Sequence, residues 1–503
     1  MKPFFIILLF ATSLLAQPWS PEVIWDRSGL EDSSLYGYSI LPLGDQNDDG
    51  FDDWAVFAYG SYPTSTGDSA YVEFFHGGNP PSTIPYATIR QADTMRIVRQ
   101  VETAGDLNDD GYQDWFLVGM YGHPADHGIV HVFFGGPDAD LIPDVEILIQ
   151  LGGWTTALGD FNGDGFDDIY VYEEYQFFGH AFFGGSPMDT VPDWTKHDLP
   201  SEGQIALPQA YGDLNGDGYS DFVSAKFSSN TTYIFLGGTN PDTVPAYTWP
   251  NMQHWPLSIV NDLNGDRYSE LVYLNCNVHY GAPQMSEIPS IQMSFPCAEG
   301  NAHVAASLGD INRDGYNDLA LVREYCSGSW WGVLSLYLGQ PALNSQPNWT
   351  IYGRGWQNLI SIGTAAGLGD VNRDGIDDFA IGAWDDLDQE GWRGRCIVVA
   401  GDTSLRVDTD EPFIPHPSSF SLLVYPNPFN ATTTLSFSLS HTSPVSLTVF
   451  NLLGQAVYQD DLGVLNAGEH SHLFDASELP SGVYLARVQA GEHSQMRKMV
   501  LLK

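Results

Sequence analysis

The sequence has few basic residues and few cysteines for its length. Among its 503 residues, 19 are lysine or arginine and 63 are aspartate or glutamate, which gives a formal net charge of −44. Because phosphate contacts need a basic surface, nucleic acid is not an expected partner. Four cysteines are too few for a disulfide-rich scaffold, and no CxxC spacing indicates a thiolate metal site. The sequence does not choose among the possible pairings of Cys276, Cys297, Cys326 and Cys396.

Long apolar runs are also absent, except at the start of the chain. Residues 1–16 begin with the basic Lys2 region, continue with PFFIILLFATSLL and end at Ala16, as is typical of a secretory signal peptide. This run is too short to cross a bilayer, and no later segment reaches roughly 18 apolar residues. We therefore expect an exported chain with no transmembrane span.

Short catalytic motifs are missing as well. GxSxG, HExxH and P-loop patterns do not occur. The stretch 121–131 contains His123, Asp126, His127 and His131, but it leads into a predicted strand and not a helix. We interpret these histidines as ordinary loop residues and not as a second metal site. The sequence therefore does not predict an enzyme.

One short acidic loop, in contrast, is repeated seven times. The copies are GDQNDDGFDD (44–53), GDLNDDGYQD (105–114), GDFNGDGFDD (159–168), GDLNGDGYSD (212–221), NDLNGDRYSE (261–270), GDINRDGYND (309–318) and GDVNRDGIDD (369–378). Their starts are 48 to 61 residues apart. A repeat of this length indicates a series of like supersecondary units.

The spacing of oxygen donors in each copy is typical of a calcium site. Counting Asp45 of copy one as position 1, side-chain oxygens occupy positions 1, 3, 5 and 9, a glycine at position 6 permits a sharp turn, and the carbonyl at position 7 adds a ligand. Oxygen donors without His or Cys suit Ca²⁺. The predicted ligands are Asp45, Asn47, Asp49, Phe51, Asp53, Asp106, Asn108, Asp110, Tyr112, Asp114, Asp160, Asn162, Asp164, Phe166, Asp168, Asp213, Asn215, Asp217, Tyr219, Asp221, Asp262, Asn264, Asp266, Glu270, Asp310, Asn312, Asp314, Tyr316, Asp318, Asp370, Asn372, Asp374, Ile376 and Asp378.

Copy five departs from this pattern, because Arg267 replaces the glycine and Glu270 replaces the closing aspartate. Arg267 is expected to strain the turn and to place a positive charge near the site. The sequence therefore does not decide whether copy five binds a metal. An EF-hand is excluded, since position 12 is Val56 in copy one and Leu117 in copy two. The remaining alternative is seven acidic turns without metal, in which the carboxylates of each turn would repel one another.

Two further segments recur in step with the loop. A glycine-tipped strand follows each loop, for example EFFHGG (73–78) and VFFGG (132–136), and a proline-led strand comes next, for example TIPYATI. The proline-led strand is missing after the seventh loop and occurs instead at the N-terminus, as PEVIW (21–25). We therefore predict an all-β fold in which residues 17–403 form a seven-bladed β-propeller, closed by the N-terminal strand.

These units resemble FG-GAP (VCBS-type) repeats, as in the propeller of integrin α subunits. The resemblance covers about three quarters of the chain. It implies that the acidic loops share one face of the ring and that ligand contacts come mainly from the opposite face. Integrin propellers carry calcium in only some blades, so up to seven sites would be an unusual occupancy.

The end of the chain differs in composition from the repeats. Residues 404–420 are rich in Pro, Ser and Asp and predict a linker, and residues 421–503 alternate apolar and polar residues as in a small β-sandwich. Tyr425-Pro-Asn-Pro-Phe, Asn451-Leu-Leu-Gly-Gln, Ser481-Gly-Val-Tyr and the terminal KMVLLK resemble the Por-type C-terminal sorting domain of the type IX secretion system. This resemblance implies a Gram-negative bacterium of the Bacteroidetes type, outer-membrane secretion machinery as a partner, and a secreted or surface location.

Aromatic residues in the loops opposite the acidic ones are candidates for ligand contacts. They are Trp330, Trp331, Trp384 and Trp392, with Tyr59, Tyr62 and Tyr121 on blades one and two. The alternative is that these rings pack between blades. We expect a calcium-binding propeller that acts as an extracellular binding or adhesion module for a polysaccharide or protein. A polysaccharide hydrolase or lyase, or a structural surface-layer component, is the alternative.

Overall fold

All regular structure in the described part of the chain is β-strand. The computed structural model describes residues 21–405 and 422–501, except 31–33, 61–69, 91–96, 122–126, 138, 151–152, 174–177, 198–210, 227–229, 251, 253–255, 297–301, 325–331, 353–361, 385–386, 389–390, 426–428, 440–442, 452–454, 467, 478, 481 and 491–492. The chain divides into two units, Met1–Val407 and Asp408–Lys503. Within the described ranges, no helix is long and apolar enough to span a membrane.

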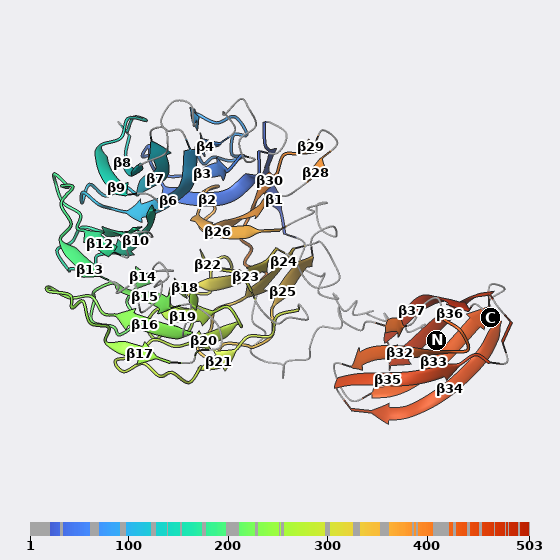
Figure 1. Cartoon of the computed structure of the whole chain (residues 1–503). Coiled ribbons are helices and arrows are strands. Elements are labelled where there is room, and N and C mark those ends of the chain that lie inside the picture. Colours follow the sequence, from blue (N-terminus) through green and yellow to red (C-terminus); the bar gives the residue numbers. More distant parts are fainter. Residues whose placement is uncertain are drawn as a thin grey trace, which may run out of the picture. The chain divides into compact units, whose positions relative to one another are not determined.

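The first unit contains seven four-stranded antiparallel sheets, as predicted (Figure 1). Blades one to three are β2 (Tyr36–Gly44), β3 (Asp53–Ala58), β4 (Tyr71–Phe75), β5 (Ala87–Arg90); β6 (Ile97–Gly105), β7 (Asp114–Tyr121), β8 (His127–Phe133), β9 (Val145–Gln150); and β10 (Gly153–Gly159), β11 (Asp168–Glu173), β12 (Phe178–Phe182), β13 (Trp194–His197). Blades four to six are β14 (Tyr211–Gly212), β15 (Asp221–Lys226), β16 (Thr231–Phe235), β17 (Tyr247–Trp249); β18 (Pro256–Val260), β19 (Glu270–Tyr273), β20 (Asn277–His279), β21 (Ile291–Gln292); and β22 (Val304–Gly309), β23 (Asp318–Arg323), β24 (Val333–Tyr337), β25 (Trp349–Tyr352).

Blade seven is completed by the start of the chain. It consists of β26 (Thr364–Gly369), β27 (Asp378–Ala383), β30 (Arg395–Val399) and, as its outer strand, β1 (Val23–Ser28). A short hairpin, β28 (Leu387–Asp388) and β29 (Gly391–Trp392), lies between β27 and β30. The antiparallel pairing of β1 with β30 confirms the predicted closure of the ring, and Figure 1 shows these two strands side by side.

The first strand of every blade contacts the first strands of both neighbouring blades, so these strands surround the axis of the ring. Seven hydrophobic clusters fill the spaces between successive blades. The second strands are almost fully buried, as in β3 and β27, because both faces of the sheet pack against a neighbouring blade. This packing explains why the segment after each acidic loop is a continuous apolar run and not an alternating one.

The second unit is a β-sandwich. One sheet has the order β31 (Leu422–Tyr425), β32 (Thr432–Leu439), β35 (Gly468–Asp475). The other has the order β34 (Ala456–Leu465), β33 (Ser443–Asn451), β36 (Gly482–Ala490), β37 (His493–Leu501). Side chains from both sheets form one core, with Leu435 and Phe474 from the first and Val449 and Met499 from the second. The predicted small β-sandwich is therefore confirmed.

Candidate metal-binding face

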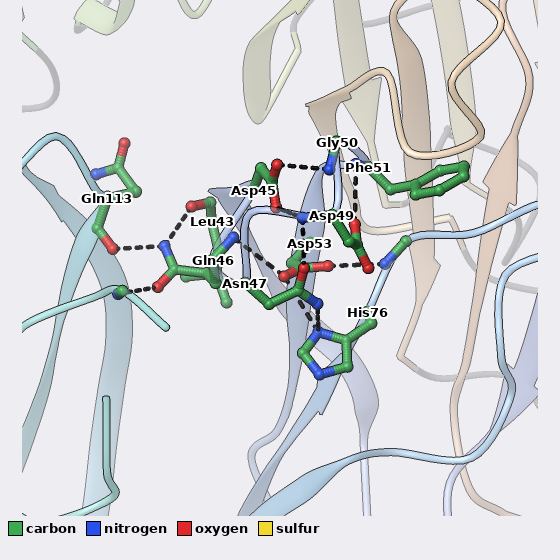
Figure 2. A network of polar contacts seen from close by, with 12 residues as sticks. Leu43, Asp45, Gln46, Asn47, Asp49, Gly50, Phe51, Asp53, His76 and Gln113 are labelled. Carbon is green, nitrogen blue, oxygen red and sulfur yellow. Dashed lines mark hydrogen bonds and ion pairs between the residues drawn. The ribbon is translucent and has the colours of Figure 1, made fainter. Parts of the chain in front are cut away.

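Every acidic loop joins the first and second strands of its blade and folds into the same turn. In copy one, the Asp49 N–H donates to Asp45 Oδ1 at 3.1 Å and to Asn47 Oδ1 at 2.9 Å, and the Gly50 N–H donates to Asp45 Oδ2 at 2.7 Å (Figure 2). The same three bonds recur in the other six copies. The oxygens at positions 1 and 3 therefore share one donor and lie on the same side of the turn.

The acid at position 9 is the first residue of the second strand and is fully buried in all seven copies. Asp114 shows its usual role: Oδ2 accepts the Leu107 N–H of its own loop at 2.7 Å, and Oδ1 accepts the Gly135 N–H of the glycine-tipped strand at 2.7 Å. Copies one, three, four and six repeat this pair of bonds. The position 9 acid thus ties the acidic loop to the third strand, a role that the spacing alone did not reveal.

The glycine tip of the third strand joins each blade to the preceding one. The Gly78 N–H of blade one donates to the Val371 carbonyl of blade seven at 2.8 Å, and five further junctions have the equivalent bond. A Cβ atom on Gly77 would approach the Asp52 carbonyl to 2.5 Å and the Val371 carbonyl to 2.9 Å. Only glycine fits between these carbonyls, which accounts for the recurring glycine.

The seventh junction, between blades two and one, uses a side chain in place of the backbone. Gln46 stands where the other loops have an apolar residue at position 2. Its Oε1 accepts the Gly136 N–H at 2.9 Å, and its Nε2 donates to the Gln113 carbonyl at 3.0 Å (Figure 2). All seven loops are therefore linked in a closed circle of hydrogen bonds.

Side chains at position 8 add further links between neighbouring loops. Asp52 Oδ2 accepts the Asp370 N–H at 2.7 Å, and Asp167 Oδ2 accepts the Asp106 N–H at 2.8 Å. Asp377 makes the same contact with Asp310 at 2.7 Å. A change in one loop is thus coupled to the backbone of the loop beside it.

Burial raises the pKa of the position 9 acids. The pKa rises to about 7 for Asp114, Asp221 and Asp378, to about 8 for Asp168 and Asp318, and to about 9 for Glu270. Loss of hydration disfavours the charged carboxylate and is the largest cause of the rise. The N–H bonds lower the pKa and the neighbouring acids raise it, each by less than burial does. A cation in the loop would favour the carboxylate and lower these pKa values.

We expect the metal-free protein to lose stability as the pH rises from 6.5 to 8.5. These acids have a higher pKa in the folded state than the ordinary value of 3.8 for Asp or 4.5 for Glu, so the folded state retains protons that the unfolded state has released. Buried His279, whose pKa burial lowers, acts in the opposite direction but only below about pH 6.5. Thermal melts in EGTA should show a falling Tm across this range and a flatter profile in calcium. A rising Tm in EGTA would contradict the assignment.

The copies are not equivalent. In copy five, the structure brings carboxylate oxygens of Asp262, Asp266 and Glu270 within 4.8 Å of one another, and no other set of three His, Cys, Asp or Glu residues in the described residues meets this condition. Glu270 is longer than the aspartate of the other copies, so its carboxylate reaches the other two acids of the loop. Copy five is the copy in which the sequence did not decide whether a metal binds. In copy seven, Asp378 Oδ2 is buried with no hydrogen-bond partner. In copy one, His76 Nδ1 lies 2.9 Å from Asn47 Nδ2 and 3.2 Å from Asp53 Oδ2.

Arg267 adopts the turn that the other copies form with glycine. Its φ is +76°, compared with +88° for Gly218 of copy four, so the predicted strain is present. In saturating calcium, Arg267→Gly should raise the free energy of unfolding by roughly 0.5–1 kcal/mol. Gly218→Arg is the matched control and should lower the free energy of unfolding, because arginine is unfavourable at the positive φ of this position. A Cβ at Gly218 meets no atom within 4 Å, so the backbone conformation is the sole source of the loss. Urea midpoints measure both, and a loss of stability in Arg267→Gly would refute the strain.

The described residues include only part of the predicted ligand set on the face opposite the acidic loops. Trp330, Trp331 and Tyr62 lie outside the described residues, and Trp392 lies in β29, paired with Leu387 of β28. Trp384 is half-buried and its ring contacts Tyr38 of blade one across the junction of blades seven and one.

The histidine stretch and the cysteines show no second metal centre in the residues that the structure describes. His127 and His131 both lie in β8, where a separation of four residues spans about 13 Å. Buried His131 places Nε2 at 3.3 Å from Glu146, and His123 and Asp126 are outside the described residues. Cys276 and Cys396 are fully buried, while Cys297 and Cys326 are outside the described residues.

Comparisons with known proteins agree with both units. Residues 423–502 match the family profile of the secretion system C-terminal sorting domain, and residues 152–180 match the FG-GAP repeat. Integrin alpha-V of Gallus gallus is 26% identical over 208 residues, which are 35% of this chain and 19% of that protein. Integrin alpha-8 of Mus musculus is 30% identical over 265 residues, 49% of this chain and 21% of that protein. The chain thus spans about a fifth of the length of these curated relatives.

Among solved structures, PorZ, a bacterial surface component of the type-IX secretion system of Porphyromonas gingivalis, is 11% identical with a TM-score of 0.32 over 92% of this chain and 51% of its own. A TM-score this low does not establish a common arrangement. The repeats and the tail define the class by fold and by similarity: a seven-bladed β-propeller that contains an FG-GAP repeat and is similar to integrin α subunits, followed by a domain that matches the secretion system C-terminal sorting domain. The sorting domain makes it a secreted or cell-surface protein.

Proposed function

We propose that this protein is an extracellular binding module whose propeller is stabilised by calcium ions in its acidic loops. The observation that carries the proposal is the identical turn in all seven copies, in which oxygens at positions 1 and 3 share the position 5 amide. A turn held in this form presents oxygen ligands without a folding step, which reduces the cost of binding a cation.

The donor set fits calcium. Carboxylate, amide and carbonyl oxygens are the ligands of a hard cation, and the residues at positions 1, 3, 5, 7 and 9 would supply them. The buried, unpartnered Asp378 Oδ2 supports a cation in copy seven, because a carboxylate oxygen buried without a partner is costly. The close Asp262, Asp266 and Glu270 carboxylates support one in copy five for the same electrostatic reason.

Calcium in these loops would also stabilise the ring as a whole. Seven loops with three motif carboxylates each place strong negative charge on one face. Each loop is linked to a neighbouring blade through a glycine tip, with Gln46 as the acceptor at one junction, and Asp52, Asp167 and Asp377 also bond directly to the adjacent loop. Relief of repulsion in one loop would therefore steady the next. We infer that the cations maintain a rigid scaffold and that the ligand binds elsewhere on the propeller.

The remaining parts serve export. We propose that residues 1–16 are removed as a signal peptide, that residues 17–403 form the propeller, that 404–420 are a linker and that 421–503 engage the outer-membrane secretion machinery. The partner of the propeller would be an extracellular polysaccharide or protein, and the protein would act by adhesion and not by catalysis.

A glycan and extracellular-matrix array, probed with the exported chain in millimolar calcium and again in EGTA, tests the proposal. Calcium-dependent binding to a defined ligand supports a recognition module. An intact fold that binds nothing on the array would overturn the binding function and favour a hydrolase, a lyase or a structural surface-layer component.

A further inference from the structure

An aromatic cluster lies on the propeller face opposite the acidic loops. Tyr38 is near the start of β2, Tyr59 follows the end of β3, and Trp384 follows the end of β27. The acidic loops leave the other ends of these strands, at Gly44 and Asp53 in blade one and at Asp378 in blade seven. The three rings therefore meet where blades seven and one adjoin, away from the proposed cation sites.

The rings are arranged as a platform. Tyr38 and Tyr59 stack with centroids 4.9 Å apart and an interplanar angle of 29°, while Trp384 stands at 61° to Tyr38 with centroids 5.9 Å apart. Tyr38 is 43% exposed, and Tyr59 and Trp384 are half-buried. A ligand could stack on the accessible face of Tyr38 and contact the inclined Trp384 ring at its side.

The platform rests on rigid backbone. The buried Phe57 ring supports Tyr38 and Tyr59 edge-on, with centroids 6.2 and 6.1 Å away. A Cβ on Gly363 would lie 2.0 Å from Trp384 Nε1, so glycine is needed there for the indole to lie against the backbone. Supported rings lose little conformational entropy when a ligand binds, as is typical of aromatic contact residues.

Polar groups accompany the rings. The Tyr38 pKa is raised first by burial, then by the neighbouring Tyr59 and by the half-buried Glu324 at the end of blade six. The hydroxyls of the stacked Tyr38 and Tyr59 therefore border the platform, and Glu324 adds negative charge to its surroundings. A sugar ring combines an apolar C–H face with outward hydroxyls, which matches an aromatic face bordered by hydrogen-bonding groups.

The charge of the chain narrows the class of sugar. A net charge of −44 repels uronic-acid, sulfated or sialylated polymers. We propose that Tyr38, Tyr59 and Trp384 form a binding platform for a neutral polysaccharide. The proposal rests on the binding function proposed above and names the ligand class and the place of binding.

The test is titration of the full exported chain, in calcium, with neutral hexasaccharides of β-glucan, mannan and xylan, and with polygalacturonate as the charged comparison. Indole fluorescence and calorimetry should report binding of at least one neutral hexasaccharide and none of polygalacturonate. Tyr38→Ala should weaken that binding about tenfold or more, and Tyr38→Phe should retain most of it, because stacking and not the hydroxyl supplies most of the contact.

Tyr352→Ala is the matched control. Tyr352 is 53% exposed at the end of β25 in blade six, so the variant should keep both its Tm and its sugar affinity. Equal affinity of Tyr38→Ala and the original chain for a neutral sugar would overturn the platform and leave the binding function standing. Binding of a protein but no neutral sugar would overturn the ligand class, and no binding of any kind would overturn both proposals.

Discussion

Removing calcium with EGTA is expected to lower the Tm of the propeller by more than about 10 °C. A ligand at 100 times its Kd stabilises a folded protein by about 2.7 kcal/mol per site, so several sites add on the order of 10 kcal/mol or more. Each kcal/mol shifts the Tm of a domain of 150–250 residues by roughly 2–4 °C, and by less in a larger one. The circle of hydrogen bonds between loops should spread the loss to all seven blades.

Differential scanning calorimetry with and without EGTA measures this shift, and excess calcium should reverse it. Half-molar sodium chloride in EGTA is the control, because salt screens repulsion between the acidic loops without filling the sites. Salt alone should recover only part of the Tm. An unchanged Tm in EGTA would contradict stabilisation by calcium. Full recovery of the Tm by sodium chloride would contradict calcium binding in the loops, because charge screening alone would then account for the effect.

Arg27→Met is expected to destabilise the closed ring by about 3–5 kcal/mol. Arg27 lies on β1, the N-terminal strand that completes blade seven, and donates through Nε and Nη2 to both oxygens of Glu73 of blade one at 2.7 Å. Its Nη1 donates to the Thr83 carbonyl at 2.9 Å. Glu73 is 1% exposed, so loss of Arg27 would leave a buried carboxylate without its cation.

Urea unfolding in calcium measures this effect, and two further variants separate its causes. Arg27→Met with Glu73→Met should recover most of the stability, because the double change removes both buried charges. Asp26→Ala breaks the neighbouring pair with Arg395, in which Asp26 is 45% exposed, and should cost less than about 1 kcal/mol. Equal costs for Arg27→Met and Asp26→Ala would refute the claim that the Arg27 pair secures the junction.

The sequence predicts the blades and their closure because each signal is local and repeated. The apolar run after every acidic loop, the glycine tip and the displaced PEVIW segment each correspond to one strand of a blade. Seven repeats in register leave few alternatives to a closed ring. The β-sandwich follows from alternation and turn residues in the same way.

The links between blades are not predictable from the same signals. The role of Asp114 in holding Gly135, and the substitution of Gln46 for a backbone acceptor, depend on contacts between segments far apart in the chain. Periodicity gives the face of a strand but not its partner across a sheet or between sheets. One signal could have indicated Gln46: it is polar where the other six copies are apolar.

Sequence reasoning identified only part of the proposed sugar platform, for a related reason. Tyr59 and Trp384 were identified from loop position, but Tyr38 was missed because it lies inside a predicted strand and looks like a core residue. Only the packing of blade seven against blade one shows that this ring remains exposed.

The central claim is that the acidic loops are calcium sites, and counting bound calcium tests it most directly. The protein would be exchanged into calcium-free buffer, titrated with calcium chloride and analysed by calorimetry together with metal analysis of the dialysed complex. We predict several ions per chain, up to one for each of the seven loops. A chain that binds no calcium at millimolar concentration, while remaining folded, would contradict the account.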